Sequence, residues 1–407
     1  MKFNFFLFLL ITGMSYSQQL LPIQYDTLSN YNEIILNGSG EYSSTAMRNE
    51  FMGKFINGGY LSTEIKDHSF KKMNGLNITG FDVNSELEYR NLKVNLFKKS
   101  NIGLIIKTGY TSIGSMTYSK DAFGLTFYGN EQYIDKTVNL TGTEFKFSTF
   151  QKIGLGIIFK KSKSSICFNY FNLQNNVQGS IIDGAFYQPN GGFNDSLKIN
   201  GDFSSSNGAK FNKGYGFGID LDLKLKIDWT KEQNAYIQFV VKNLGLATIS
   251  SGATTYTFDS TYHYSGFKLN QLIGENNVFS DTTQIYSQLG IQKSIQRSNL
   301  FLPVMLQVGK IVDQYQLRKL QSFFGIRMFP TMSYIPLVYA GANYKLNQVF
   351  DFGLQESYGG FANFRTGLYV NAKIKKWVFG IASENIIGAF NKNGNGKSLI
   401  FRLQCRF

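Results

Sequence analysis

The chain has 407 residues and a formal net charge of +14, and aromatic residues make up 16% of it, with 38 Phe, 24 Tyr and 41 Gly against only 5 Pro. The basic residues are spread along the chain without a dense cluster, which argues against nucleic acid as a partner. Contact with anionic lipid, or a lumen that prefers anionic solutes, fits this charge better, and a merely solvated surface is the alternative.

The N-terminus predicts export. A short positively charged region, Met1-Lys2, precedes an apolar run from Phe3 to Met14. The small residues Ser15 and Ser17 then lie three and one positions before an expected cleavage site at Gln18. Residues 1–17 therefore read as a cleaved signal peptide. No cysteine follows the cut, so no lipoprotein anchor is expected, and the rest of the chain has no apolar run of about 18 residues that would form a spanning helix.

Residues 18–75 are expected to form an N-terminal segment with some helix. Phe51, Phe55, Leu61 and Ile65 recur at a helix-like spacing. We expect this segment to lie in the periplasm or in the lumen of the fold, and residues 76–407 to form the β-barrel.

From residue 76 onward, segments with the composition of strands recur every ten to fifteen residues, separated by Asn-, Gly- and Lys-rich breaks. The expected strands lie at 77–90, 91–98, 101–114, 138–148, 151–160, 163–173, 176–188, 194–204, 213–229, 233–244, 254–267, 283–295, 299–311, 317–329, 333–345, 348–357, 361–374, 376–386 and 397–407. Some are expected to be loops, and Ser265 to Gly274 is expected to be a short helical break. The estimate is about 14 spanning strands, within a range of roughly 12–16.

The stretch from Tyr215 to Trp229 alternates strictly between apolar residues and glycine or charge. At ~3.3 Å per residue it reaches on the order of 45 Å, which is long for a globular strand but suits a tilted membrane strand, with Trp229 in an interfacial aromatic girdle. The alternative is a long strand of a soluble sandwich. The chain also ends on an alternating strand closed by Phe407, as bacterial outer-membrane barrels do, and there the barrel-assembly machinery would be the partner. The fold predicted is all-β, a closed antiparallel transmembrane β-barrel in the outer membrane of a Gram-negative cell.

Charged residues of the long strand and of the last strand are expected to line the lumen, because lysine or arginine facing lipid near the midplane costs ~2–4 kcal/mol. These candidates are Asp220, Asp222, Lys224, Lys226, Asp228, Arg402 and Arg406. They either line a solute path or pair with each other and close the lumen.

No constellation of catalytic residues is apparent. The two histidines are His68 and His263, and His263 is expected to be a polar lining residue. Cys167 and Cys405 are expected on opposite faces of the wall, where a disulfide cannot form. The glycines at 214, 216 and 218 precede a strand and not a helix, which excludes a dinucleotide-binding loop. No enzyme activity, metal or cofactor is expected.

Three short motifs carry a resemblance. They are Asn243-Leu244-Gly245, Tyr264-Ser265-Gly266-Phe267 and Asn385-Ile386-Ile387-Gly388, where Glu384-Asn385 replaces the usual Asp-Asn. Together they resemble a family of Bacteroidota outer-membrane barrels of unknown function, and more distantly the long-chain fatty-acid channels and the barrel subunits of type IX secretion. The resemblance implies fold and location, and no site residues.

Two functions follow as hypotheses. The first is a transport channel or carrier for a small or hydrophobic solute. The second is a non-transporting barrel subunit of a secretion or surface-assembly complex, with protein partners in the outer membrane.

Overall fold

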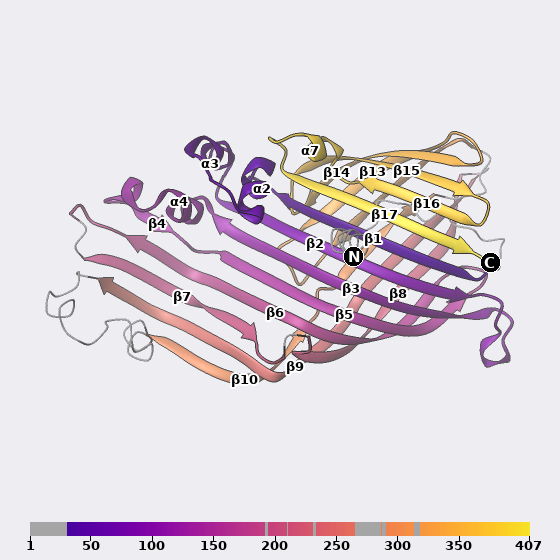
Figure 1. Ribbon diagram of the computed structural model, residues 1–407, viewed down its shortest axis with the longest axis horizontal. Coiled ribbons are helices and arrows are strands. Elements are labelled where there is room, and N and C mark those ends of the chain that lie inside the picture. The colour runs from indigo at the N-terminus through magenta and orange to yellow at the C-terminus, as the bar shows by residue number, and fades with distance from the viewer. Residues whose placement is uncertain are drawn as a thin grey trace, which may run out of the picture.

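The computed structural model describes residues 31–191, 194–209, 211–230, 233–264, 286, 290–312 and 318–407. The predicted signal peptide and the helical break at 265–274 lie outside these residues, as does the side chain of Trp229. The described chain is mostly strand, and its 17 strands form one sheet (Figure 1).

The sheet closes on itself as an antiparallel barrel of 14 strands. Closure is made by β1, which pairs antiparallel with β17 on one side and with β2 on the other. In ring order the strands are β1 (Glu33–Ser44), β2 (Leu76–Asn91), β3 (Ile102–Ser119), β5 (Thr143–Phe159), β6 (Ser165–Tyr187), β8 (Gly214–Thr230), β9 (Gln233–Tyr264), β11 (Met305–Ile311), β12 (Leu320–Met328), β13 (Ile335–Lys345), β14 (Phe350–Gly360), β15 (Phe364–Ile374), β16 (Trp377–Ser383) and β17 (Gly396–Arg406). A closed ring leaves no unpaired strand edge, so every backbone polar group of the wall can be paired without water.

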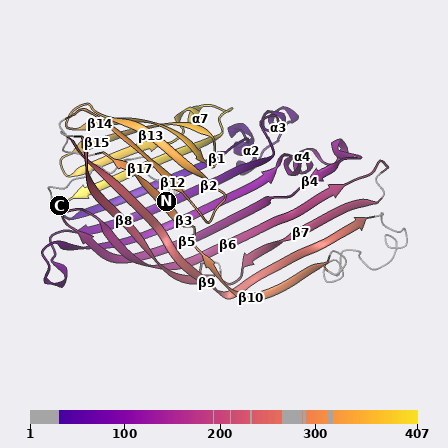
Figure 2. The same ribbon diagram turned by 180° about the vertical axis from the view of Figure 1, so that it is seen from behind.

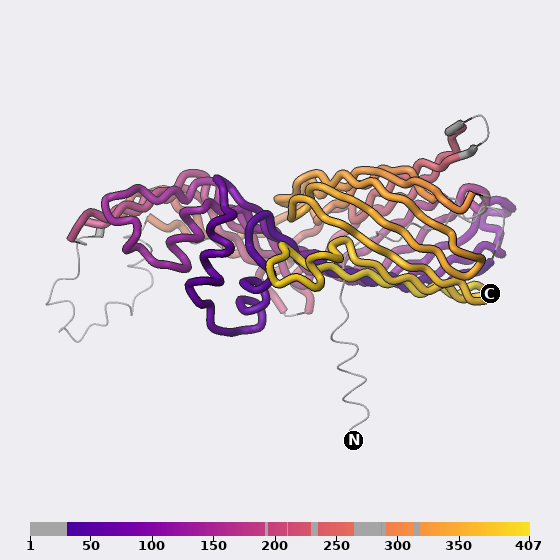
Figure 3. Tube along the Cα trace, turned by 90° about the horizontal axis from the view of Figure 1, so that it is seen from above, coloured from indigo at the N-terminus to yellow at the C-terminus, as the bar shows by residue number. Residues whose placement is uncertain are grey.

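Three further strands, β4 (Thr137–Asn139), β7 (Asp195–Ser206) and β10 (Ile291–Phe301), pair with parts of β6 and β9 that run beyond the ring. We call the distal parts of β6, β7, β9 and β10 the sheet extension. It continues the wall to one side of the barrel (Figures 2 and 3). The expected breaks within β6 and β9 are therefore wrong: these strands have 23 and 32 residues because they belong to both the barrel and the extension.

The barrel has two different ends. At the turn end, where Glu33 faces Arg406, strands are joined by short connections such as 160–164, 346–349 and 375–376. At the loop end, the connections are longer and hold the helices α2 (Asn49–Asn57), α3 (Thr63–Phe70), α4 (Lys120–Tyr128) and α7 (Ile386–Phe390). The turn end also holds the 3-10 helix η1 (Leu96–Lys98), and the loop end holds η2 (Glu131–Tyr133). None of the helices in the described part of the chain is long and apolar enough to cross a membrane.

The N-terminal boundary differs from the prediction. Residues 33–44 form the closing strand β1, so the barrel begins before residue 76. The expected helices at 45–75 exist, but they lie in the connection from β1 to β2 at the loop end, opposite the end that holds Glu33. The sequence pattern does not predict β1, because glycines occupy the outward positions 38 and 40 and weaken the apolar alternation. The strand expected at 91–98 is also wrong, since β2 ends at Asn91 and a turn with η1 follows.

The wall is apolar outside and polar inside. In β14, Phe350, Phe352 and Leu354 are exposed, whereas Asp351 and Gln355, at the alternate positions, are each 2% exposed. This pattern is the reverse of a water-soluble protein, in which charged groups are almost never fully buried without partners. It is the pattern of a barrel whose outer face meets lipid.

Candidate functional site in the lumen

Polar side chains from the inner faces of β2, β3 and β5 meet those of β8 and β9 inside the barrel. On β2, the inward positions Asn84, Glu86, Glu88 and Arg90 alternate with outward apolar residues and are all buried. Alternation along a strand therefore places a row of charges in the lumen, where each must find a partner because isolated buried charges are costly.

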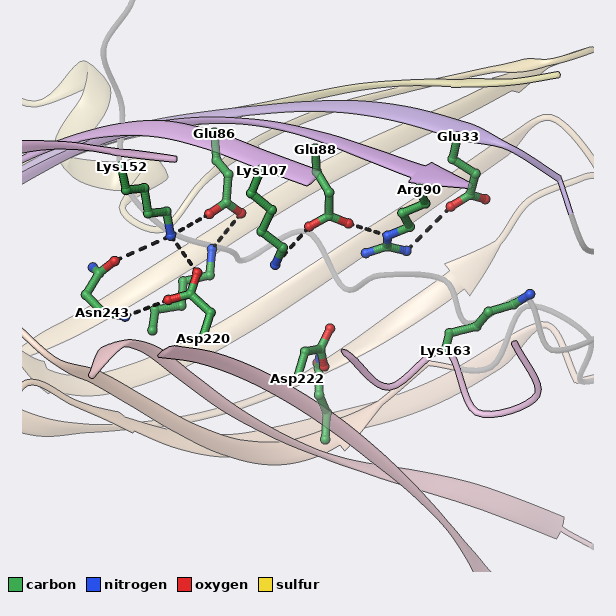
Figure 4. A network of polar contacts seen from close by, with 12 residues as sticks. Glu33, Glu86, Glu88, Arg90, Lys107, Lys152, Lys163, Asp220, Asp222 and Asn243 are labelled. Atoms are coloured by element: carbon green, nitrogen blue, oxygen red, sulfur yellow. Dashed lines mark hydrogen bonds and ion pairs between the residues drawn. The ribbon is translucent and has the colours of Figure 1, made fainter. Parts of the chain in front are cut away.

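The first chain of ion pairs runs along the turn-end half of the lumen (Figure 4). Arg90 is paired with Glu88 and lies 3.4 Å from Glu33, measured from Nη1 to Oε2. Lys107 of β3 lies 3.0 Å from the other oxygen of Glu88. Arg406 of β17 reaches Glu33 at 3.3 Å. These pairs link β17, β1, β2 and β3 on one side of the lumen.

A second set of ion pairs crosses the lumen. The Lys152 amine of β5 lies 2.8 Å from Glu86 Oε2 and 2.7 Å from Asp220 Oδ2, and the Lys242 amine of β9 lies 3.1 Å from Glu86 Oε1. β2 and β9 are separated in the ring by β3, β5, β6 and β8, so the contact between Glu86 and Lys242 joins walls that face each other. In Figure 4 the side chains of β2 and β5 point toward Asp220 and Asn243 on the facing wall.

A β-bulge in β9 lies beside this crossing. Two residues of β9, Lys242 and Asn243, stand opposite the single residue Asp220 of β8. Asn243 has a positive φ of 58°, and its backbone N–H donates to Asp220 Oδ1 at 2.8 Å. Asparagine tolerates the left-handed conformation better than most residues. Both bulge residues thus face the lumen, and the alternation of β9 changes phase beyond them.

A third pair lies nearer the turn end. The Lys224 amine is 2.6 Å from Asp222 Oδ2 and donates to the Lys163 carbonyl at 3.1 Å, while Gln238 donates to Asp222 Oδ1 at 2.7 Å. The Arg402 Nε donates to Asn37 Oδ1 at 2.8 Å. Together these groups leave a cavity of about 50 Å³, room for a few water molecules and too little for an organic solute.

The structure brings five of the seven predicted lining residues to this cavity. They are Asp220, Asp222, Lys224, Arg402 and Arg406. The other two, Lys226 and Asp228, are exposed and do not line it. They continue the inward alternation of β8, but by residue 226 the strand has reached the open rim of the turn end, where water surrounds the side chains.

Other partners in the network were not among the predicted residues: Glu33, Glu86, Glu88, Arg90, Lys107, Lys152 and Lys242. For β2 a signal was present, since Glu86, Glu88 and Arg90 alternate with Leu87 and Tyr89 as clearly as the charges of β8 do. For Lys152 the sequence offers only an isolated lysine. Lys242 follows the alternation of Gln238 and Val240, which are also buried, and the bulge changes the phase only from Asn243 onward.

The loop end of the lumen is closed by residues 329–334, which we call the lumen-crossing loop. Within this loop, the Ser333 backbone N–H donates to Ser115 Oγ of β3 at 3.1 Å, and the Ser333 hydroxyl donates to Glu144 of β5 at 3.1 Å. The loop connects β12 to β13, on the side of the ring opposite β3 and β5. Its Phe329 and Met332 pack with Ile113, Val240 and Met305 of the strands and with Phe361, which follows β14.

A second ionic cluster supports this closure. Arg365 of β15 lies 2.7 Å from Glu41 of β1, and Arg327 of β12 lies 2.5 Å from Glu384, which follows β16. All four side chains are at most 3% exposed. The lumen is thus crossed at its loop end by residues 329–334 and further along by the ion pairs of Glu86.

The regular strand pairing of the wall is interrupted between β7 and β8. These two strands run in line along β6 and β9, and the described residues between 206 and 214 keep only scattered backbone hydrogen bonds, from the Asn207 N–H to the Gly252 carbonyl at 3.0 Å, from the Lys213 N–H to the Leu173 carbonyl at 2.8 Å and from the Ser250 N–H to the Lys213 carbonyl at 2.9 Å. Side chains bridge the gap: the Lys213 amine donates to Asn175 Oδ1 at 2.9 Å, and Ser206 Oγ accepts from the Asn176 N–H at 2.9 Å. Behind the interruption lies an apolar cluster formed by Phe150, Phe171, Leu173, Ala247, Ile249, Ala253 and Leu302.

The described residues hold no group of three or more His, Cys, Asp or Glu arranged to bind a metal ion. Cys167 is buried on the inner face and Cys405 lies on the outer face of β17, and both are free thiols. His263 is exposed on the sheet extension opposite Ser196, so it does not line the lumen as expected.

No protein-family model matches the chain. No curated protein matches it. Among solved structures, the toluene transporter TodX of P. putida is 9% identical with a TM-score of 0.43, covering 97% of this chain and 96% of that chain. The toluene transporter TbuX of Ralstonia pickettii is 10% identical with a TM-score of 0.41, covering 93% and 90%. The outer membrane protease OmpT of Escherichia coli is 9% identical with a TM-score of 0.23, covering 96% and 99%. These similarities are weak, and the barrel rests on its own strand pairing. The resemblance to the Bacteroidota family stays a prediction.

Proposed function

We propose that the protein is an outer-membrane carrier for small apolar solutes, with a lumen that is closed at rest and a solute route through the wall. The observation that carries this proposal is the combination of a closed, charged lumen with an apolar cluster placed behind the interruption of the wall between β7 and β8.

The outer face supports the membrane placement. Exposed apolar residues form a belt around the ring, for example Leu87 on β2, Ile153 on β5, Leu354 on β14 and Phe379 on β16. Trp377 stacks with Phe379 near the turn end, where an aromatic girdle is expected. By the general rule that short turns face the periplasm, the turn end is the periplasmic end. The C-terminal strand ending at Phe407 would then be recognised by the barrel-assembly machinery from that side.

The lumen argues against a permanently open pore. Glu86 is held by Lys152 and Lys242 from two other strands, and this crossing lies between the loop end and the turn end. An ion or apolar solute passing straight through would have to separate buried ion pairs, each of which is costly to break.

The interrupted wall offers a different exit. Between residues 206 and 214 the neighbouring strands are held by a few backbone hydrogen bonds and by side-chain hydrogen bonds in place of a regular ladder, and such contacts are worth only about 1 kcal/mol each. The cluster of Phe150, Phe171 and Ile249 would hold an apolar solute just inside this point. The solute would enter when the lumen-crossing loop moves and leave sideways into the lipid.

A cross-link tests the route. Ser206 and Asn176 stand one position beyond the last registered pair, Val177 with Ser205, at the edge of the interruption. In a chain with Cys167→Ser and Cys405→Ser, the pair Asn176→Cys and Ser206→Cys would close this edge by a disulfide.

We expect oxidation of this variant to slow uptake of an apolar fluorescent probe into proteoliposomes, and reduction to restore it. A matched control carries Ser322→Cys and Ala342→Cys, a registered pair of the continuous ladder between β12 and β13. Equal uptake by both oxidised variants would exclude the wall route, and no uptake by any variant would exclude transport.

The second candidate function is a non-transporting barrel subunit of a surface complex. The closed lumen favours it, and the sheet extension offers a partner a polar surface beyond the barrel. A folded protein that neither conducts in planar bilayers nor takes up the probe, but brings down a stable partner in mild detergent, would replace the carrier proposal with this one.

A further inference from the structure

A large apolar groove lies on the outer face of the wall at the loop end, away from the lumen. Its volume is about 960 Å³. The strand register places its floor on one face: Lys397 and Leu399 pair with Tyr42 and Gly40, and these pair with Phe81 and Val83. The floor continues through Gly114 and Met116 of β3 to Phe147 and Phe145 of β5. This is the face that carries exposed Leu87 nearer the turn end, so it is the lipid-facing side.

Glycine shapes the floor of the groove. A Cβ on Gly114 would lie 2.5 Å from the ring of Phe81, so the ring lies flat on the bare backbone of the neighbouring strand. The rings of Phe81 and Phe147 are in contact, with centroids 5.9 Å apart and planes tilted by 43°. The result is an aromatic surface that runs along the wall.

Two helices form the roof. Met52 and Ile56 of α2 and Ala389 of α7 face the floor. α2 is held in place at its start, because the Asn49 amide donates to the carbonyls of Gly388 at 2.7 Å and Asn391 at 2.9 Å. Figure 1 shows α2 and α7 next to one another at the loop ends of β1 and β17.

The surroundings of the groove point to a membrane lipid. It is continuous with the apolar belt through Val83 and Leu399, so an acyl chain can enter it from the bilayer without crossing water. Phe55 and Tyr60 beside the roof are exposed, as in helices that lie in a membrane interface. Lys397 at the rim has no ion-pair or hydrogen-bond partner for its amine among the residues that the structure describes, and it is exposed to receive an anion.

The wall beneath the groove is closed. The ladders of β1 with β2 and of β2 with β3 run without a register shift across the whole groove. A molecule in the groove therefore has no path into the lumen at this place, which favours a resident lipid over a transported solute.

We propose that this groove binds one acyl chain of an anionic, phosphate-bearing membrane lipid, with the phosphate at Lys397. The inference rests on the proposed membrane placement of the barrel and does not require transport.

The test measures lipid that stays bound after detergent exchange. Folded protein is incubated with phosphatidylglycerol or phosphatidylcholine, and retained lipid is counted by native mass spectrometry. We expect the wild type to retain one phosphatidylglycerol and less phosphatidylcholine. Val83→Trp fills the groove and should lower retention at least tenfold, whereas Leu87→Trp, on the same strand and face but outside the groove, should leave it unchanged. Met116→Trp is a second filling variant, should Val83→Trp not fold.

The charge is tested separately. Lys397→Gln should lower phosphatidylglycerol retention about fivefold, since one lysine near an anionic headgroup contributes about 1 kcal/mol. Lys376→Gln, an exposed lysine at the turn end, is the control. Equal retention by Val83→Trp and Leu87→Trp, or by Lys397→Gln and Lys376→Gln, would overturn the proposal. Tighter binding of the uncharged probe 1-N-phenylnaphthylamine than of lipid would also overturn the proposal, because the groove would then be a binding site for an apolar solute. Loss of probe uptake with lipid retention intact would count against the carrier function only.

Discussion

Removal of the Lys152 amine should be among the most destabilising single substitutions in the lumen. The side chain is 3% exposed and lies between two carboxylates, at 2.8 Å from Glu86 and 2.7 Å from Asp220. In Lys152→Met, Glu86 keeps Lys242 at 3.1 Å, but Asp220 is left with the backbone N–H of Asn243 and no cation. Breaking a buried pair from one side typically costs about 3–5 kcal/mol, so we expect a loss of that size.

The assay is urea unfolding of the protein folded into lipid vesicles, followed by heat-modifiable gel migration. The second substitution Asp220→Asn removes the orphaned charge, so the double variant should recover roughly half of the loss. Lys198→Met is the matched control, because Lys198 and Asp183 form a short pair of 2.5 Å whose side chains are 53% and 50% exposed. This control should change stability by less than about 1 kcal/mol. If Lys152→Met cost no more than Lys198→Met, water would fill this part of the lumen and the ion pairs would not close it.

Three further outcomes are expected. Gly80→Ala should lower the free energy of unfolding by about 1–3 kcal/mol in the same assay, since the added Cβ would lie 2.4 Å from the buried ring of Phe361. The control Gly53→Ala on α2 adds a Cβ with no atom within 4 Å, so it should be neutral or stabilising. Asn243→Gly should be nearly neutral and Asn243→Val destabilising by roughly 1–3 kcal/mol, because the bulge needs a positive φ; equal effects would mean that the bulge relaxes. In planar bilayers the wild type should show no steady conductance, and steady current from it would contradict the closed lumen. Removal of the lumen-crossing loop should not produce a conducting pore either, since the ion pairs of Glu86 with Lys152 and Lys242 still block the lumen.

The face assignments came directly from alternation. Along β8, Tyr215, Phe217 and Leu225 are exposed and Asp220 and Lys224 are buried, as their positions in the sequence predict. The same rule placed Arg402 inward and Leu399 outward on β17. The rule works because side chains of a strand point to opposite faces at a period of two, whatever the strand pairs with.

The rule fails where the backbone departs from that period. The bulge at Lys242 and Asn243 inserts one extra residue and reverses the faces beyond it. An alternation continued past residue 243 therefore assigns the inner and outer faces of the following residues wrongly. The expected strand at 233–244 ends at this bulge, whereas β9 continues to Tyr264. Strand β1 was missed for a different reason, since Gly38 and Gly40 occupy two of its outward positions.

By itself the sequence determined that the chain forms a barrel of long amphipathic strands with charges inside, because a period-two pattern is a local property of consecutive residues. Only the tertiary structure decided what those charges do. Whether Asp220 lines an open path or meets Lys152 depends on which strands face each other across the ring, and on the bulge that brings Asn243 to Asp220. These partners lie far apart in the chain, and their approach is set by strand order, register and the diameter of the closed sheet, which no local pattern encodes.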